Sequence, residues 1–186
     1  GLVEGSGRES GDEIQSIFEQ RIRPIVVNLS TGTPNEEVDP LTYDQRRASS
    51  DSDRSRAVPA NDSRIRRVPD LGAVYLVREA EGEEVEAVVL PVHGAGLWGQ
   101  MYGYLALQSD GRTIRGVSFY EHQETPGLGA EIENTDWTAQ WQGRQIADET
   151  GEIRFEVLKG EAGDVESDPY RVDGLTGATM TSNGVT

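Results

Sequence analysis

The segment MYGYLALQSDGRTIRGVSFY at residues 101–120 decides the fold class. Its two halves, residues 101–107 and 114–120, are apolar and rich in aromatic side chains. Asp110 and Gly111 stand between them, and Asp-Gly is a sequence that tight hairpin turns favour because glycine tolerates positive φ. The segment therefore predicts two antiparallel strands joined by a short turn.

Further strand-like runs flank this hairpin in the sequence. Residues 74–77 and 87–90 are apolar and β-branched, and a charged turn around Gly82 separates them. Residues 155–158 have the composition of another short strand. Together with the hairpin, these runs predict a meander of antiparallel strands followed by one more strand.

A short helix is expected between the hairpin and the last strand. Asp136 is a good capping residue, and Trp137 and Trp141 are one helical turn apart, so their side chains share a face. A meander, a short helix, a further strand and a terminal turn predict one α+β domain. Its sheet is expected to be mostly antiparallel, with flanking helices.

The N-terminal part begins with a helical pattern. Ser10 and Glu13 resemble a capping box, and Pro24 is expected to end the helix. The apolar residues at helical spacing are Ile14, Ile17, Phe18 and Ile22. Residues 28–70 contain several prolines and a polar run, so no regular period is readable there.

Two short basic patches, residues 43–47 and 63–67, interrupt this otherwise acidic chain. They could dock on an acidic partner or on phosphate. They could instead form a solvated surface with local ion pairs, which is the more common role of such patches. The sequence leaves both interpretations open.

The composition excludes several functional classes. A formal net charge of -16 over 186 residues repels nucleic acid, so no nucleic-acid partner is expected. The absence of cysteine excludes structural disulfides, thiolate metal sites and thiol catalysis. Lys159 is the only lysine, and an acidic, arginine-rich chain suggests a surface adapted to high salt, where self-repulsion is screened.

Three glycine-rich stretches, residues 91–99, 121–129 and 173–184, each follow strand-like residues. The last of them reads DGLTGATMTSNG and adds hydroxyl side chains that can donate, accept or be esterified. Such a stretch is often only a turn between two elements. Loops at strand ends also build ligand sites, so the three stretches together are a candidate site.

These stretches resemble one family of flavoproteins. PVHGAGLW at 91–98, ETPGLG at 124–129 and DGLTGATMTSNGV at 173–185 occur in the order and with the separations found in NqrC, a component of sodium-translocating NADH:quinone oxidoreductases. The resemblance extends from about residue 43 to residue 185. In that family FMN is joined through its phosphate to the last threonine of the terminal motif. The resemblance therefore implies Thr179 as the attachment residue, a separate flavin transferase and no catalytic residue in this chain.

A flavin needs a flat apolar surface for its ring and hydrogen-bond donors for its carbonyl groups and phosphate. Trp98 could stack on the ring, although a tryptophan in such a loop is more often a packing anchor. Leu128 could contact the ring face and Thr125 its polar edge, and Lys159 could pair with the phosphate or with reduced flavin. Lysine at that position is more often an exposed strand end. The expected FMN-binding residues are Trp98, Glu124, Thr125, Gly127, Leu128, Gly129, Lys159, Thr176, Gly177, Ala178, Thr179 and Thr181, with no metal ligand.

The resemblance also implies a domain division and a cellular place. Residues 1–42 would be an N-terminal helix and linker after a missing transmembrane helix, and residues 43–186 an FMN-binding domain with a truncated C-terminal segment. The domain would lie on the outer side of the bacterial cytoplasmic membrane. It would relay electrons between the other subunits of the reductase during sodium transport, and alone it would not turn over substrate.

Four alternatives remain open. The RnfG-type subunit of a ferredoxin:NAD complex shares the ETPGLG loop and the cofactor, although the His-Gly-x-Gly-Leu-Trp loop favours NqrC. A flavin-free module could use the glycine loops to dock another subunit. His93 and His122, with Glu121 and Glu124, could bind a divalent metal, although nothing fixes their spacing. A hydrolase would need a Ser or Thr beside one of these histidines, and no Gly-x-Ser-x-Gly elbow is present.

Overall fold

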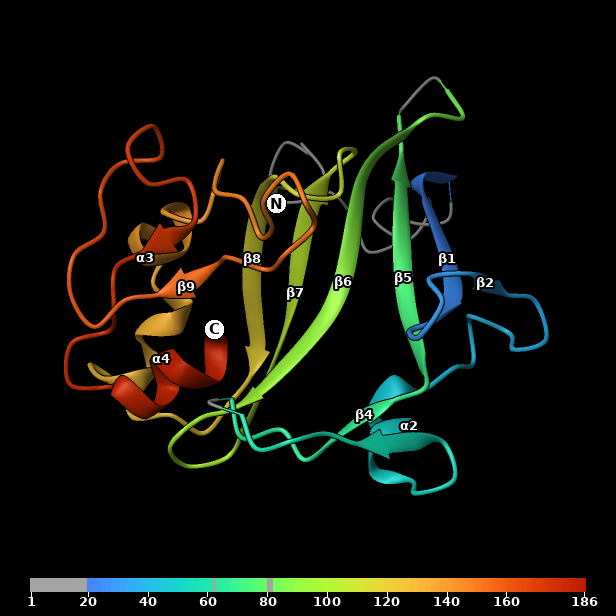
Figure 1. Cartoon of the computed structure of the whole chain (residues 1–186), viewed down its shortest axis with the longest axis horizontal. Helices are drawn as coiled ribbons and strands as arrows, with labels where there is room; N and C mark the ends of the chain where they lie inside the picture. The colour runs from blue at the N-terminus through green and yellow to red at the C-terminus, as the bar shows by residue number, and fades with distance from the viewer. Residues whose placement is uncertain (1–19, 62, 80–81) are drawn as a thin grey trace, which may run out of the picture.

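A six-stranded antiparallel sheet forms the centre of the molecule (Figure 1). The computed structural model describes residues 20–61, 63–79 and 82–186. The strands run in the order β2-β1-β5-β6-β7-β8, and neighbouring strands are all antiparallel. Their bounds are β1 Ile22–Asn28, β2 Pro34–Asn35, β5 Leu71–Arg78, β6 Val85–Ala95, β7 Gln100–Gln108 and β8 Ile114–Glu121. The predicted α+β class with a mostly antiparallel sheet is confirmed.

The hairpin predicted around Asp110 is the β7–β8 pair. The Asp110 carboxylate accepts hydrogen bonds from the backbone N–H groups of Arg112 and Thr113, both at 2.8 Å, and from the Thr113 hydroxyl at 2.6 Å. Gly111 has a φ of +68°, a conformation that glycine adopts without steric cost. The local sequence therefore specifies this turn by itself.

Strand β6 is longer than expected. Residues 91–95, which the sequence pattern assigns to a glycine-rich loop, continue the strand and pair with β7. Helix α4 (Thr179–Val185) packs directly on Gly94, which explains why a glycine stands inside this strand. A Cβ at Gly94 would overlap the carbonyl oxygen of Gly184. Glycine here marks a close backbone approach, and the expected loop shrinks to residues 96–99.

The C-terminal part of the chain packs beside β8 (Figure 1). It contains the 3-10 helix η1 (Gly129–Glu133), α3 (Thr135–Ala139), β9 (Glu156–Val157), β10 (Arg171–Val172) and α4. The strand expected at 155–158 is thus only two residues long, and it pairs in parallel with β10 outside the main sheet. The main core lies between these elements and the sheet. Its buried residues include Met101, Leu107, Ile114, Ile132, Trp137, Trp141 and Val172.

The two tryptophans after η1 share a buried face, as predicted. The ring centroids of Trp137 and Trp141 are 5.5 Å apart. The predicted cap was wrong, however, because Asn134 caps α3 by accepting a hydrogen bond from the backbone N–H of Asp136 at 2.9 Å. Asparagine and aspartate are comparable caps, so the sequence alone could not choose between two candidates that lie two residues apart.

The helix expected after Ser10 lies mostly outside the described residues, in which Gln20 and Arg21 are helical. Ile22, expected on the apolar stripe of that helix, begins β1 instead, and Pro24 lies inside this strand. The predicted extension of the helix to Pro24 is therefore wrong. Among the described residues β2 pairs only with Val26 and Val27, so Pro24 lies on an open edge, where a missing N–H is tolerated.

The segment without a readable period forms small elements beside β5. These are α2 (Gln45–Ser50), β3 (Ser55–Ala57) and β4 (Arg67–Pro69). Asp44 caps α2 by accepting a hydrogen bond from the backbone N–H of Arg47 at 2.9 Å. The Tyr43 hydroxyl donates to the carbonyl of Leu71 at 2.7 Å and so fastens the segment to the sheet. Within the described ranges no helix is long and apolar enough to cross a membrane.

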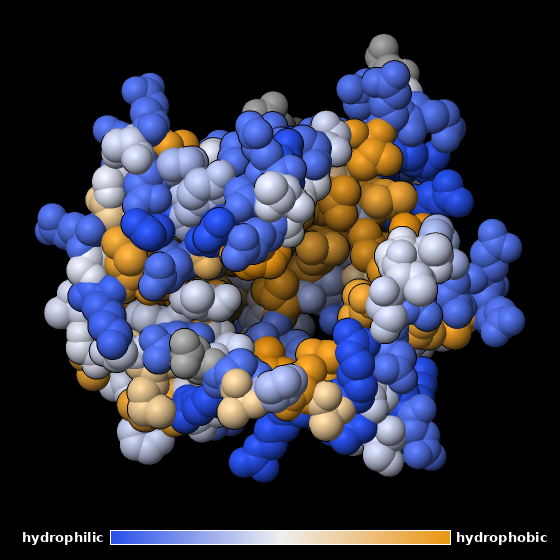
Figure 2. Space-filling view, in the orientation of Figure 1, coloured by the Kyte–Doolittle hydropathy of each residue, from blue (hydrophilic) through white to orange (hydrophobic). Residues whose placement is uncertain are grey.

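One face of the sheet contains a hydrophobic hollow. Figure 2 shows hydrophobic residues gathered over the middle of this face, around β6 and its neighbours. A cavity of about 280 Å³ opens between β6, β7, β8 and the end of α4. Its lining includes Leu105, Phe119, Trp141 and Val185.

Candidate functional site

Glu124 joins the three glycine-rich stretches. Its Oε1 accepts a hydrogen bond from the backbone N–H of Trp98 at 2.9 Å, and its Oε2 accepts one from the N–H of Leu97 at 3.2 Å. The hydroxyl of Thr181, on α4, also donates to Oε2. Glu124 is only 6% exposed, so these three donors replace water around its carboxylate. The stretches that we expected to form one site therefore meet at one carboxylate.

Two glycines make room for this carboxylate. A Cβ at Gly129 would lie 2.5 Å from Oε2 of Glu124 and 2.6 Å from the Thr181 hydroxyl. A Cβ at Gly96 would overlap Oε1. Because neither glycine has a side chain, the backbone at these two positions can pack closely around the buried carboxylate of Glu124.

The charge on Glu124 is held by its hydrogen bonds. Burial raises the pKa of Glu124, whereas the bonds from the Thr181 hydroxyl and from the N–H groups of Trp98 and Leu97 lower it. The nearby His122 acts in the same direction as these bonds. The net result is a pKa below the ordinary value for glutamate, so the group is ionised at neutral pH.

The terminal motif is anchored before it enters α4. The carboxylate of Asp173 accepts a hydrogen bond from the side-chain amide of Gln140 at 3.0 Å, and its carbonyl accepts one from the indole N–H of Trp137 at 2.8 Å. Gly174 follows, and a Cβ there would overlap the carbonyl oxygen of Leu158. The start of the motif is therefore fixed against the C-terminal core.

The rest of the motif leads into a helix. Gly177 has a φ of +71°, and a Cβ there would lie 3.1 Å from the side chain of Leu128. The segment expected as a terminal turn then continues as α4 from Thr179 onward. The Ser182 hydroxyl accepts a hydrogen bond from the N–H of Leu175 at 3.3 Å and ties the helix back to the motif.

An exposed apolar patch lies around the start of α4. It consists of Leu97, Trp98, Leu128 and Met180, which are between 43% and 64% exposed. Trp98 is the most exposed of the four, and its indole N–H donates to the Thr125 hydroxyl at 3.1 Å. Trp98 is therefore a surface residue and no packing anchor. Thr179 is exposed as well, and its hydroxyl has no hydrogen-bond partner among the described residues.

The predicted FMN-binding residues form two layers. The exposed layer contains Trp98, Thr125, Gly127, Leu128, Thr176, Gly177 and Thr179. The buried layer contains Glu124, Gly129, Ala178 and Thr181. Lys159 belongs to neither layer, because its side chain is exposed and forms no recorded contact with these loops within the described residues. Its backbone does lie beside Gly174.

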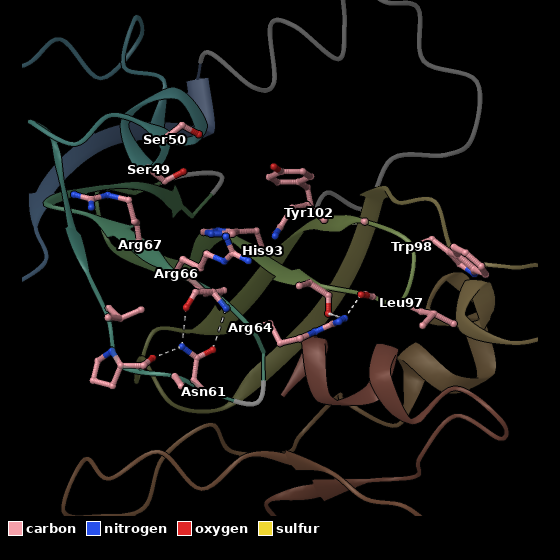
Figure 3. A pocket seen from close by; sticks show the side chains of 18 residues that line it. Ser49, Ser50, Asn61, Arg64, Arg66, Arg67, His93, Leu97, Trp98 and Tyr102 are labelled. Carbon is pink, nitrogen blue, oxygen red and sulfur yellow. Dashed lines mark hydrogen bonds between the residues drawn. The ribbon is translucent and has the colours of Figure 1, made fainter.

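Arg64 contributes to the site, although the sequence marked it only as part of a basic patch. Its Nη2 donates to the carbonyl oxygens of Ala95, at 3.2 Å, and of Gly96 (Figure 3). Its φ of +53° is uncommon for a residue with a side chain. The Asn61 side chain holds this loop by donating to the carbonyl of Ile65 at 2.8 Å and accepting from its N–H at 3.0 Å.

Arg64, Arg66 and Arg67 line a wide cavity of about 1030 Å³ that reaches Trp98 at its far edge (Figure 3). None of these three arginines forms an ion pair with a carboxylate of the described residues. The other basic patch behaves differently, because Arg46 forms a two-bond ion pair with Glu121 at 2.7 and 2.9 Å. Local ion pairing therefore accounts for part of the patch at residues 43–47. Docking on an acidic partner or on phosphate stays open for the patch at residues 63–67.

The two histidines have separate partners. His93 stacks on Tyr102 with ring centroids 6.0 Å apart, and burial lowers the pKa of His93. His122 accepts a hydrogen bond at Nδ1 from the N–H of Glu124 at 3.1 Å, and its Nε2 lies 3.1 Å from a carboxylate oxygen of Glu133. Over residues 20–61, 63–79 and 82–186, no group of three or more His, Cys, Asp or Glu side chains could hold a metal ion.

Known proteins resemble this chain in sequence. A family model described as the FMN-binding domain matches residues 96–186. The NqrC component of the Na(+)-translocating NADH-quinone reductase of Yersinia pestis is 43% identical over 96% of this chain and 66% of its own length. The same component from Vibrio vulnificus strain YJ016 is 43% identical over 99% of this chain and 71% of its own length. The chain thus spans about two thirds of the length of these relatives.

Solved structures show the same relationship. The crystal structure of Shewanella oneidensis NqrC superposes with a TM-score of 0.84 at 34% identity, over 95% of this chain and 80% of that chain. The corresponding protein from Parabacteroides distasonis gives a TM-score of 0.69 at 29% identity, over 96% of this chain and 77% of that chain. All four relatives are NqrC proteins, which favours this assignment over an RnfG-type subunit. Sequence, fold and the flavin-domain match agree, and the chain belongs to the NqrC family of the Na+-translocating NADH-quinone reductases.

Proposed function

We propose that this chain holds FMN through a phosphoester to Thr179 and relays electrons between other subunits of the reductase. The position of Thr179 carries this proposal. Thr179 is exposed at the first residue of α4, its hydroxyl has no recorded partner among the described residues, and the exposed apolar patch lies around it. The FMN-binding domain match covers this whole region. When bound, FMN supplies one- and two-electron redox chemistry.

The residues around Thr179 suit a flavin. Trp98 and Leu128 present flat apolar surface to solvent, which matches the needs of the isoalloxazine ring. Gly177 has no side chain, so the approach beside Leu128 stays open. Thr125 is exposed and can still donate its hydroxyl proton, because its oxygen accepts from Trp98. These groups would orient the ring, and Lys159 remains a candidate partner for the phosphate.

Attachment requires help from another protein. In the expected reaction Oγ of Thr179 bonds to the phosphorus of the FMN half of FAD, the pyrophosphate bond breaks, AMP leaves, and the hydroxyl proton passes to a base. Within the described residues no side chain forms a recorded hydrogen bond with that hydroxyl through which it could take the proton. We therefore expect a separate flavin transferase to supply the base and to choose the threonine.

The domain would work on the outer side of the cytoplasmic membrane, with the other reductase subunits as partners. Residues 1–42 would connect it to a membrane anchor, and residues 43–186 would form the flavin domain. NADH and quinone would react on other subunits, so this domain alone would not turn over substrate. A covalent bond suits a carrier that meets different partners in turn, because the cofactor cannot dissociate between encounters.

Intact mass spectrometry tests this proposal. The chain would be produced together with a flavin transferase that is active on a known flavoprotein, beside Thr179→Ala and Thr135→Ala. Thr135 is a matched control because it is an exposed threonine at the first residue of another helix, α3, outside the expected FMN-binding residues. Wild type and Thr135→Ala should gain one FMN less one water, and Thr179→Ala should gain nothing. No gain in the wild type would leave a flavin-free docking module as the better interpretation.

A further inference from the structure

We propose that Arg64 and Glu124 are positioning residues that clamp the Trp98 loop, residues 96–99, from opposite sides. The carbonyl of Gly96 accepts a hydrogen bond from the Arg64 guanidinium. The N–H of Leu97 donates to Glu124 at 3.2 Å. These two groups belong to the same peptide unit, so one peptide lies between a cation and an anion. The inference rests on the proposed flavin at Thr179 and concerns how its tryptophan neighbour is held.

The charges fix the direction of this peptide. A carbonyl oxygen carries partial negative charge and an N–H partial positive charge, so each end faces its favourable partner. Each charged partner polarises the peptide and thereby strengthens the hydrogen bond at the other end. A flipped peptide would turn its oxygen towards the carboxylate of Glu124 and its N–H towards Arg64. Both contacts would then be repulsive, so the two residues together exclude the alternative loop conformation.

One backbone hydrogen bond closes the Trp98 loop, from the N–H of Gly96 to the carbonyl of Gly99 at 2.7 Å, but it involves neither the peptide between Gly96 and Leu97 nor the Trp98 side chain. Trp98 is 64% exposed, and its side chain has one recorded hydrogen bond, to Thr125. Gly96 and Gly99 flank the loop and add backbone freedom. The N–H of Trp98 itself donates to the second oxygen of Glu124, so the carboxylate holds two consecutive amides.

Glu124 also couples this loop to the helix that begins at Thr179. The same oxygen that accepts from Leu97 accepts from the hydroxyl of Thr181. Gly96 and Gly129 enclose the carboxylate so closely that neither position has space for a Cβ. Glu124 therefore acts on the flavin through the protein groups that it holds, and it sets the position of Trp98 relative to Thr179.

The opposite half of the clamp is equally specific. Arg64 adopts a positive φ, and Asn61 fixes the loop that carries it. This conformation brings the Arg64 guanidinium to the two carbonyls before Leu97 (Figure 3). Arg66 lies two residues further on, is exposed and has no recorded side-chain partner among the described residues. It provides a matched control with the same charge on the same loop.

Amide hydrogen exchange in the flavin-free chain tests the clamp directly. NMR would follow the amides of Leu97 and Trp98 in wild type, Arg64→Ala, Glu124→Gln and Arg66→Ala. In Arg64→Ala and Glu124→Gln the protection factor of both amides should fall by at least about tenfold, equivalent to about 1.4 kcal/mol. In Arg66→Ala it should match the wild type. The amide of Leu105 in β7 reports whether the sheet is intact. Unchanged exchange at Leu97 and Trp98 in Arg64→Ala and Glu124→Gln would overturn the proposal.

A second measurement uses the flavin-loaded chain. Trp98 beside the ring should quench flavin fluorescence, and Trp98→Phe gives the level without this quenching. Arg64→Ala should still carry flavin by mass but approach the fluorescence of Trp98→Phe, whereas Arg66→Ala should keep the wild-type value. A loaded Arg64→Ala with wild-type quenching would count against the clamp. If the wild type takes up no flavin, the proposed function fails, and the exchange experiment still decides whether the clamp exists.

Discussion

At the scale of single residues, Glu124 keeps its charge because its hydrogen bonds outweigh its burial, which places its pKa below the ordinary value. A carboxylate with a lowered folded-state pKa stabilises the protein above its unfolded pKa, about 4.3. That contribution is lost as the pH falls through the folded-state value. Glu124→Gln removes the charge and replaces one acceptor oxygen with a donor that faces the N–H of Trp98 or Leu97. The variant should therefore be less stable at neutral pH by about 1–3 kcal/mol.

Urea unfolding of wild type and Glu124→Gln between pH 7 and pH 3 measures this contribution. The stability difference should be constant from pH 7 to about pH 5 and should shrink as the pH falls below about 4.3, because the unfolded chain then binds a proton that the folded carboxylate still lacks. All other carboxyl groups are common to both proteins, so their titration cancels in the difference. A difference that stays the same down to pH 3 would show that the charge of Glu124 does not stabilise the site.

At the scale of elements, the contact between β6 and α4 determines where Thr179 stands. A Cβ at Gly94 would overlap the carbonyl oxygen of Gly184, so Gly94→Ala should push α4 away from the strand. We expect a loss of about 1–3 kcal/mol, typical of an overpacked core, and a lower yield of flavin on Thr179. Gly116→Ala is the control, because a Cβ on that strand glycine would meet no atom within 4 Å.

Chemical denaturation and intact mass would be measured on both glycine variants. Gly116→Ala should keep the wild-type stability within about 0.5 kcal/mol, the usual range for a substitution without a new clash. If Gly94→Ala were as stable as Gly116→Ala and as fully modified, α4 would not depend on its contact with β6. The position of Thr179 would then be set by the terminal motif alone.

Elements with local signals were predictable, and elements made by distant contacts were not. The β7–β8 turn follows from Asp110 and Gly111, whose hydrogen bonds all lie within the turn. The extension of β6 was missed because Gly94 is explained by α4, which lies about ninety residues later in the chain. Glu124 was named from the resemblance, but its partners come from the 96–99 loop and from helix α4. Arg64 carried no signal beyond its charge, because its role depends on a peptide more than thirty residues away.

At the scale of the whole molecule, the net charge of -16 opposes the compact state through self-repulsion. Salt shortens the range of this repulsion, from about 10 Å at 0.1 M to about 3 Å at 1 M. Salt also screens the ion pairs, but an exposed pair such as Arg154 with Glu152 stabilises by only about 0–1 kcal/mol. The repulsion acts between many more groups, so its loss should dominate.

We therefore expect the midpoint of thermal unfolding to rise between 0.1 M and 2 M NaCl, and to rise similarly in KCl, because the effect comes from screening and does not depend on a bound cation. Glu149 is exposed and has no recorded partner among the described residues, so Glu149→Lys reverses one repelling charge without removing a contact. This variant should be more stable than the wild type at 0.1 M NaCl and should gain less from added salt. A midpoint that falls with salt in both proteins would mean that attractive ion pairs outweigh repulsion, and the acidic surface would then need another explanation.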